Sequence, residues 1–338
     1  MVDAVRIGMV GCGGIARPHV RGWKSIPTKA RIVAGADVDE GGRQWLRSEV
    51  SEARLHDGFE ALIADPDVDA VDICLPHHLH RVAILAAAQA GKHILCEKPL
   101  CLTLAEAHEI GEAVERSGVT FMAAHNHLMW PALQEAARIV RDGQLGAPIA
   151  LRTLDCGRTP VRPGQPRAQP GWRADRARAG GGELLDTGYH PVYTMLFLAQ
   201  SAPTEVTAMA GRYHLTDLPA EDTAHVLIRF ADGAIGNILT TWAFRLPTGN
   251  PLFQVVCADG EVFGRDHTIA VRQGDAAPVE RTLPVVDSIA AEVAHFADCV
   301  RLGRRPLQTH IEATMALRVI LAAYRSIAEG ITVALPRQ

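Results

Sequence analysis

The sequence lacks three features that would point to other classes of protein. Lys and Arg number 34 against 38 Asp and Glu, the formal net charge is −4, and there is no long basic run. Nucleic acid and anionic membranes are therefore poor candidate partners. No apolar stretch is long enough to span a bilayer. The seven cysteines are scattered and form no C-x-x-C pair, so we expect reduced, buried thiols in a cytoplasmic protein.

The composition that remains is that of an ordinary globular protein. Hydrophobic residues make up 48% and charged residues 21% of the 338 positions. This length favours roughly two domains. Strand-like sequence starts at residue 4, so we expect no signal peptide.

A glycine-rich turn follows the first apolar strand, residues 5–10, and leads directly into helical sequence. Its spacing is G-x-G-x-x-A, with the first glycine allowing a tight turn and the second letting the backbone approach a pyrophosphate. The N-terminus of the following helix would face the phosphates. The motif comprises Gly11, Gly13, Gly14, Ile15 and Ala16. It predicts a dinucleotide site.

An acidic residue, Asp37, ends the next strand, residues 31–36. It lies about 20 residues beyond the glycine turn, where an acid binds the adenosine ribose hydroxyls. Val38 follows, and no Arg stands beside Asp37 in the sequence to receive a 2′-phosphate, so we expect NAD rather than NADP. The alternative is that Asp37 caps the helix expected near residues 40–50.

Strands and helices then alternate as far as about residue 127. We expect strands over 70–75, 92–96 and 119–124, with helices over 81–90 and from a capping box at 103–106 to about 118. This alternation predicts a parallel, doubly wound sheet that binds ligands at the carboxyl ends of its strands. The residues expected on that edge are Gly11, Asp37, Pro76, Lys98 and Asn126.

The strand ending at Cys96 delivers Glu97, Lys98 and Pro99 at its tip. Burial disfavours the charged form of a lysine, which makes a lysine in this setting a plausible proton donor or acceptor near neutral pH. For the tripeptide taken alone, a strand-end ion pair before a turn is the alternative. A rigid Lys98-Pro99 bond would fix the direction of the ammonium group, and the sequence leaves its cis or trans form open.

A long loop precedes the second polar motif. Residues 156–179 are rich in Arg, Pro and Gly, and they form either a solvated excursion or an active-site lid ending at Trp172 and Arg173. The three glycines 180–182 are expected to open a helix. On it Asp186 and His190, four residues apart, would share one face, while Pro191 removes a helical hydrogen bond and should kink the helix.

The remaining sequence predicts an α+β domain with a broad, mostly antiparallel sheet. Asp232-Gly233 is expected to form a hairpin turn. The expected elements are a helix over 130–142, strands over 149–155, 204–212, 223–230, 234–242, 253–258, 268–272 and 281–285, and helices over 289–301 and 312–328. The domains are therefore placed at residues 1–127 and 128–338.

Taken in order, these motifs resemble the Gfo/Idh/MocA family of glucose–fructose oxidoreductases and inositol dehydrogenases. The similarity covers nearly the whole chain. It implies NAD-dependent hydride transfer from a secondary alcohol of a cyclic polyol or sugar, and a homodimer or homotetramer formed through the C-terminal sheet. The residues that carry it are the glycine turn, Asp37, Pro76 to His80, Gly91 to Pro99, Trp172-Arg173 and Gly181 to His190.

The resemblance also implies roles for individual residues. His190 would take the hydroxyl proton while Lys98 donates hydrogen bonds to the same oxygen. Asp186 would orient His190 or a neighbouring hydroxyl, and Glu97 would position Lys98 or the nicotinamide ribose. The expected cofactor residues are Gly11, Gly13, Gly14, Ile15, Asp37, Val38, Leu75, Pro76, His80, Glu97, Lys98 and Asn126. The expected substrate residues are Lys98, His127, Trp172, Arg173, Asp186 and His190.

Histidines at neighbouring strand ends raise the possibility of a metal site. No H-E-x-x-H or Cys/His spacing supports one, so we predict no metal. His80 is expected to be structural or near the nicotinamide, and His127 to line the substrate pocket. Tyr193 stands where the family often carries an acid. The histidines concerned are His77, His78, His80, His125 and His127.

Two other functions remain open on sequence alone. Some relatives use bound NAD in a redox-neutral glycoside cleavage, in which the sugar is oxidised only transiently. A non-enzymatic, NAD-bound regulator on the same fold is the other. Retention of Lys98, Asp186 and His190 argues against the regulator, because a sensor needs no proton relay.

Overall fold

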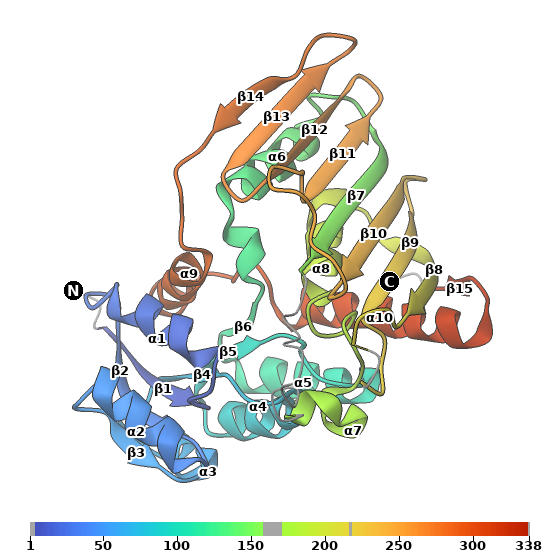
Figure 1. The fold of residues 1–338 in the computed structure, drawn as a ribbon. Coiled ribbons are helices and arrows are strands. Elements are labelled where there is room, and N and C mark those ends of the chain that lie inside the picture. Colours follow the sequence, from blue (N-terminus) through green and yellow to red (C-terminus); the bar gives the residue numbers. More distant parts are fainter. Residues whose placement is uncertain (1–3, 158–170, 216–217, 337–338) are drawn as a thin grey trace. The chain divides into compact units, whose positions relative to one another are not determined.

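The computed structural model describes residues 4–157, 171–215 and 218–336 (Figure 1). The described residues form two compact units, one from 4–126 with 287–314 and the other from those within 127–286 with 315–336. The sequence placed the whole of 128–338 in the second domain, whereas residues 287–314 pack with the first unit. The reason is helix α9 (Ser288–Leu302), which packs on α1 (Ala16–Lys24) at Gly22, where a Cβ would lie 2.9 Å from Val293.

The first unit is built on a six-stranded parallel sheet in the order β3-β2-β1-β4-β5-β6. This confirms the doubly wound sheet, to which the structure adds the short β3. The order reverses between β1 and β4, the point at which such sheets bind ligands. The strands are β1 (Val5–Val10), β2 (Ala30–Ala36), β3 (Arg54–His56), β4 (Ala70–Ile73), β5 (His93–Glu97) and β6 (Phe121–Ala124).

The helices of the first unit follow the expected alternation. Thr103 and Glu106 form the predicted capping box at the start of α5, which ends at Gly118 in the left-handed conformation (φ 66°). The elements are α1, α2 (Glu40–Glu49), α3 (Phe59–Ile63), η1 (His77–Leu79), α4 (His80–Gln89), α5 (Leu104–Ser117), the first residue of η2 (Asn126–Met129), α9 and the first turn of α10 (His310–Glu329).

The second unit contains a nine-stranded sheet in the order β14-β13-β12-β11-β7-β10-β9-β8-β15. Among the described strands, β7 and β10 pair in parallel and the other pairs are antiparallel, as predicted. The sequence missed β12 and β15. The strands are β7 (Pro148–Cys156), β8 (Pro203–Gly211), β9 (Thr223–Phe230), β10 (Ile235–Thr241), β11 (Phe253–Cys257), β12 (Gly260–Arg265), β13 (Thr268–Gln273), β14 (Val279–Thr282) and β15 (Val333–Ala334).

Helices cover one face of this second sheet (Figure 1). α8 (Tyr189–Ala199) packs on β7 and β10, α6 (Pro131–Arg141) packs on β12, and Ser326 of α10 accepts a hydrogen bond from the β8 backbone. Alternation along β9 buries Val226, Ile228 and Phe230 beneath these helices and leaves Leu227 exposed on the other face. Two short elements complete the unit, η3 (Trp172–Ala174) and α7 (Arg176–Ala179). Of the helices described, none has the length and apolar character that crossing a membrane requires.

Candidate active site

The glycine turn lies at the reversal point of the first sheet. Gly11 has a φ of 94°, and a Cβ there would lie 2.5 Å from the carbonyl oxygen of Cys74, so only glycine fits. Gly13 and Gly14 are exposed, with no atom of the described residues within 4 Å of either Cβ position. Helix α1 begins at Ala16, directly after the turn. An open backbone before a helix N-terminus fits the pyrophosphate of NAD.

Asp37 is tied to this turn, since its Oδ2 accepts a hydrogen bond of 2.7 Å from the backbone N–H of Cys12. It does not cap α2; that residue is Asp39, which accepts from Gly42 N–H at 2.9 Å. The capping alternative for Asp37 is therefore wrong. A ribose-binding role stays a prediction.

A guanidinium that the sequence did not place lies beside Asp37. Arg43 Nη1 donates to the backbone carbonyls of Asp37 (2.6 Å) and Val38 (3.1 Å). Arg43 follows Asp37 by six positions in the sequence. It was overlooked because only the residues adjacent to Asp37 were considered for a cation. The Val38 side chain itself is 88% exposed.

Other expected cofactor residues of the first unit lie in the segments that follow β4 and β6, with His80 at the start of α4 and Asn126 at the start of η2. Leu75 approaches the Gly11 Cβ position to 3.2 Å. His80 is fully buried, with Nδ1 2.6 Å from Pro99 O and Nε2 2.9 Å from Leu75 O, and burial lowers its pKa. Both ring nitrogens face backbone carbonyls, which favours the structural interpretation of this histidine. Asn126 donates to Ser288 Oγ at 3.0 Å.

The tip of β5 carries Lys98, which is half-buried. The Lys98–Pro99 bond is cis. Glu97 is 9% exposed, and its Oε2 accepts a hydrogen bond of 3.0 Å from the backbone N–H of Lys98. That contact supports the role of positioning Lys98 over the alternative of binding the nicotinamide ribose.

In the second unit, the glycine run does not open a helix as expected. Gly180 ends α7 with a φ of 83°. A Cβ on Gly181 would lie 2.3 Å from the Tyr324 hydroxyl, and one on Gly182 would lie 2.4 Å from Glu221 O. The glycines therefore permit close packing against α10 and the segment before β9.

Helix α8 begins only at Tyr189, which corrects two expectations. Asp186 lies in the turns before the helix, where Gly188 N–H bonds Glu183 O at 2.8 Å, so Asp186 and His190 do not share a helix face. Pro191 falls in the first turn of α8, where it breaks no helical hydrogen bond and has no reason to kink the helix. The sequence pattern could not separate these irregular turns from helix.

His190 is held among aromatic rings. Its Nδ1 lies 2.6 Å from the Tyr193 hydroxyl oxygen, which also accepts from the backbone N–H of His127 at 3.2 Å. The His127 ring stacks on His190 with centroids 4.1 Å apart and on Trp130 at 3.9 Å. The structure thus brings His127 and His190 together. The sequence marked Tyr193 only as a departure from the family and gave no sign of its contact with the imidazole.

The end of the long loop meets Asp186. Arg173 Nε lies 2.5 Å from Asp186 Oδ2, and the Arg173 guanidinium stands 4.3 Å from the centroid of the Trp172 ring. Asp186 is 8% exposed, so its carboxylate is buried against an exposed arginine. The predicted substrate residues Trp172, Arg173 and Asp186 are therefore neighbours. Arg158, Arg162 and Arg167 of the same loop lie outside the described residues.

The five strand-end histidines do not form a metal-binding group within the described residues. Burial lowers the pKa of His125 to about 4, and its Nδ1 lies 3.0 Å from Gln308 Oε1. A group with the spacing of metal ligands does occur elsewhere, at His19, Asp72 and Cys74. The sequence had singled out none of these three.

Comparison with known proteins agrees with this architecture. Residues 5–125 match the model of an oxidoreductase family with an NAD-binding Rossmann fold, and residues 133–263 match the GFO/IDH/MocA C-terminal domain. The chain is 30% identical to 1,5-anhydro-D-fructose reductase of Ensifer adhaerens, over 96% of this chain and 97% of that protein. It is 28% identical to scyllo-inositol 2-dehydrogenase (NAD(+)) of Bacillus subtilis, over 99% and 97%.

A solved structure shares the fold over the same extent. It is the aldose-aldose oxidoreductase of Caulobacter crescentus in complex with glycerol, with a TM-score of 0.85, 26% identity and coverage of 98% of this chain and 100% of that one. The chain is therefore an NAD-binding oxidoreductase. It belongs to the Gfo/Idh/MocA family.

Proposed function

We propose that this protein oxidises a secondary alcohol of a cyclic polyol or sugar, transferring hydride to NAD. The relatives named above act on an anhydrosugar and an inositol, as their names state. The observation that carries the proposal is the contact between His190 Nδ1 and the Tyr193 hydroxyl at 2.6 Å. It fixes the orientation of one imidazole in the unit that the family uses for substrate.

Bound NAD supplies the hydride acceptor. Gly11, Gly13 and the N-terminus of α1 hold its pyrophosphate, and Asp37 binds the adenosine ribose. A carboxylate at that position repels a 2′-phosphate, so NAD is preferred over NADP. Arg43 directs its Nη1 to the carbonyls of Asp37 and Val38, so the carboxylate of Asp37 keeps its place at the ribose.

His190 acts as the general base through Nε2. The Tyr193 oxygen accepts from His127 N–H, and its second lone pair can accept from Nδ1–H of His190, the tautomer that this role requires. With the ring hydrogen held on Nδ1, Nε2 is the basic nitrogen. Stacking on His127 restrains the plane of the ring. The proton of the substrate hydroxyl passes to Nε2 as hydride leaves the carbon that bears this hydroxyl.

Lys98 stabilises the charge that develops on the substrate oxygen by donating N–H hydrogen bonds to it. Glu97 bonds the backbone of Lys98 and so sets the direction in which the side chain leaves β5. Asp186, neutralised by Arg173, accepts a hydrogen bond from a neighbouring hydroxyl of the polyol. Trp172 offers an apolar surface to the C–H face of a sugar ring.

A substrate screen with two variants tests this proposal. A panel of inositols and aldoses is assayed with NAD and NADP, and NADH should accumulate in solution with at least one polyol or sugar. Lys98→Ala and His190→Ala should each lower turnover by roughly 10²- to 10⁴-fold while NAD still binds. The exposed residues Lys24 and His108 supply matched controls, Lys24→Ala and His108→Ala, with unchanged turnover.

Two outcomes contradict the proposal. Normal turnover in Lys98→Ala or His190→Ala contradicts the roles assigned to these residues in proton transfer. Cleavage of a glycoside without accumulation of NADH replaces net oxidation with the redox-neutral reaction.

We also propose that the protein is a homodimer or homotetramer formed through the uncovered face of the nine-stranded sheet. Met209, Leu227 and Ile235 lie on β8, β9 and β10 with 77%, 45% and 44% of their surfaces exposed. Apolar side chains grouped on adjacent strands favour association. Light scattering coupled to size-exclusion chromatography should give at least twice the chain mass, and a monomer would contradict the assignment.

A further inference from the structure

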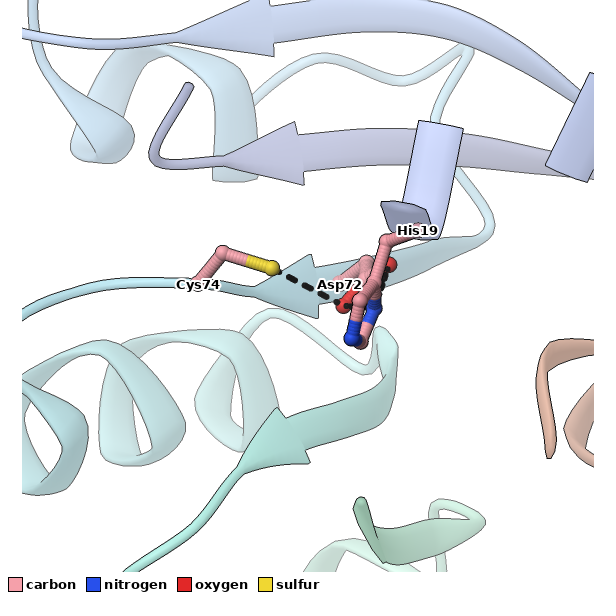
Figure 2. Close-up of side chains that lie close together, drawn as sticks. All are labelled: His19, Asp72 and Cys74. Carbon is pink, nitrogen blue, oxygen red and sulfur yellow. Dashed lines mark hydrogen bonds and ion pairs between the residues drawn. The ribbon is translucent and has the colours of Figure 1, made fainter. Parts of the chain in front are cut away.

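A buried histidine in the first unit contacts a carboxylate with each of its ring nitrogens. His19 Nδ1 lies 2.9 and 3.1 Å from the two carboxylate oxygens of Asp72, and Nε2 lies 3.1 Å from Glu97 Oε1. His19 and Asp72 are 0% exposed. Figure 2 shows the His19 side chain extending from α1 to Asp72 on β4.

Two ionised carboxylates can only accept hydrogen bonds, so a ring that bonds both must carry a hydrogen on each nitrogen. Burial is the largest single influence and disfavours the imidazolium, yet the Asp72 charge, the hydrogen bond to Asp72 and the contacts of Cys74 together outweigh it and hold the pKa of His19 well above its ordinary value. Burial likewise is the largest single influence on Glu97 and opposes its ionisation, but the hydrogen bond and charge of His19, together with the charge and backbone N–H of Lys98, outweigh it and lower the pKa of Glu97. At neutral pH the pair is therefore His19⁺ and Glu97⁻.

The imidazolium belongs to a chain of contacts that ends at Lys98. At one end Trp23 Nε1 donates to Asp72 Oδ2 at 2.7 Å. At the other, Glu97 uses Oε1 for His19 and Oε2 for the backbone N–H of Lys98. Helix α1, strand β4 and the tip of β5 are joined through one ring.

We propose that His19 is a positioning residue for Lys98, acting as a buried imidazolium that bridges Asp72 and Glu97 and fixes the carboxylate that bonds the Lys98 backbone. This rests on the proposed role of Lys98 in the reaction. Loss of His19 leaves Glu97 without its cation, so the carboxylate becomes protonated at a higher pH and stops holding Lys98 in one direction.

A metal ion bound by His19, Asp72 and Cys74 explains the geometry less well. Burial raises the pKa of Cys74, so its sulfur stays a thiol rather than a metal-binding thiolate, and it lies 3.6 Å from Asp72 Oδ1 (Figure 2). Asp72 Oδ2 already accepts from Trp23, and both His19 nitrogens face carboxylates. These contacts account for the cluster without an ion.

The other titratable group facing this cluster is Glu292 of α9. It is 0% exposed, neither of its carboxylate oxygens has a hydrogen-bond partner among the described residues, and burial raises its pKa well above the ordinary value. Burial therefore favours its neutral form. The charges around His19 are those of Asp72 on β4 and Glu97 on β5.

Nitrogen NMR of the wild-type protein gives the first test and needs no variant. The ring nitrogens of His19, assigned by their absence in His19→Gln or by sequential assignment, should have imidazolium shifts at about pH 7. A neutral ring at that pH would overturn the proposal. So would a metal ion recovered at one equivalent per chain by elemental analysis of the protein as purified.

A double-mutant cycle gives the second test. His19→Gln should lower kcat roughly tenfold, the loss expected for a charge-assisted hydrogen bond, with the KM for NAD within about twofold of wild type. The acidic limb of its kcat profile should move to higher pH. In a Glu97→Gln background, His19→Gln should leave kcat almost unchanged, because His19 acts through Glu97.

Controls separate this inference from a general loss of fold and from failure of the proposed function. His125→Gln removes another fully buried histidine, bonded to Gln308, and should leave the pH profile in place. If His19→Gln lowers kcat as much in the Glu97→Gln background as it does in the wild type, the inference is refuted. The proposed function still stands in that case, provided that Lys98→Ala shows its expected loss of turnover. Full turnover in Lys98→Ala instead refutes the proposed function, and the NMR result is independent of it.

Discussion

Replacing Tyr193 with Phe should weaken catalysis by removing the oxygen that orients His190. The lost contact is the 2.6 Å hydrogen bond to His190 Nδ1, and His127 N–H loses its 3.2 Å acceptor as well. A net hydrogen bond contributes about 0.5–1.5 kcal/mol, which corresponds to a roughly two- to twelvefold fall in kcat. The effect stays below that of His190→Ala because stacking on His127 still restrains the ring.

The assay is the initial rate of NADH formation with the best substrate of the screen. The loss should fall on kcat, since the tautomer of His190 matters for the chemical step, while the KM for NAD stays within about twofold. Tyr213→Phe removes a hydroxyl from a tyrosine that is 72% exposed and should have no effect. A wild-type kcat in Tyr193→Phe refutes the orienting role of the hydroxyl. A fall in kcat equal to that of His190→Ala refutes the claim that stacking on His127 still restrains the ring.

Two further predictions concern the first unit. Asp37→Asn keeps an acceptor for Cys12 N–H but removes the charge, so the ratio of kcat/KM for NAD over NADP should fall by about tenfold or more, and an unchanged ratio would contradict the ribose assignment. Burial raises the pKa of Glu292 in the folded state above its ordinary value of 4.5, so its contribution to stability is present below that pH and is lost as pH rises toward the raised pKa. Glu292→Gln removes this loss, and its stability relative to wild type should grow by up to about 1.4 kcal/mol per pH unit as the pH rises above about 5 toward the raised pKa. Urea denaturation at several pH values measures it, and a difference independent of pH would contradict the buried acid.

The sequence predicted the first unit well because its signals are local. The glycine turn, the Thr103–Glu106 capping box and the left-handed Gly118 each depend on a few neighbouring residues. It missed β12, in which Gly260 and Gly264 interrupt the apolar pattern and a Cβ at Gly260 would lie 2.1 Å from Arg272 O. It also placed α9 in the wrong unit, because its packing on α1 is a contact between residues far apart in sequence.

The candidate site shows the same division between local and long-range contacts. Lys98, Glu97, His127 and His190 can be singled out from motifs, whereas the contacts of Tyr193 with His190 and of His19 with Glu97 cannot. Asp186 was assigned to a helix because turns that bond Gly188 to Glu183 have the same local composition as a helix start. Nothing in the spacing of His19 and Asp72, which lie 53 positions apart, indicates that they share a hydrogen bond.

The buried contacts around Lys98 explain how a flexible side chain could be used for a reaction that needs a fixed geometry. On one side His80 bonds the carbonyl of Pro99, and on the other His19 bonds the carboxylate of Glu97. The residues before and after Lys98 are therefore both held by buried imidazoles, which fixes the backbone from which the lysine side chain extends. His80 bonds backbone atoms, so substitution there should disturb the chain path whatever the pH. His19 bonds an ionised side chain, so its loss should be felt most where Glu97 can take up a proton. A different pH dependence for the two histidines is thus the signature that distinguishes a charge-based support of Lys98 from a purely structural one.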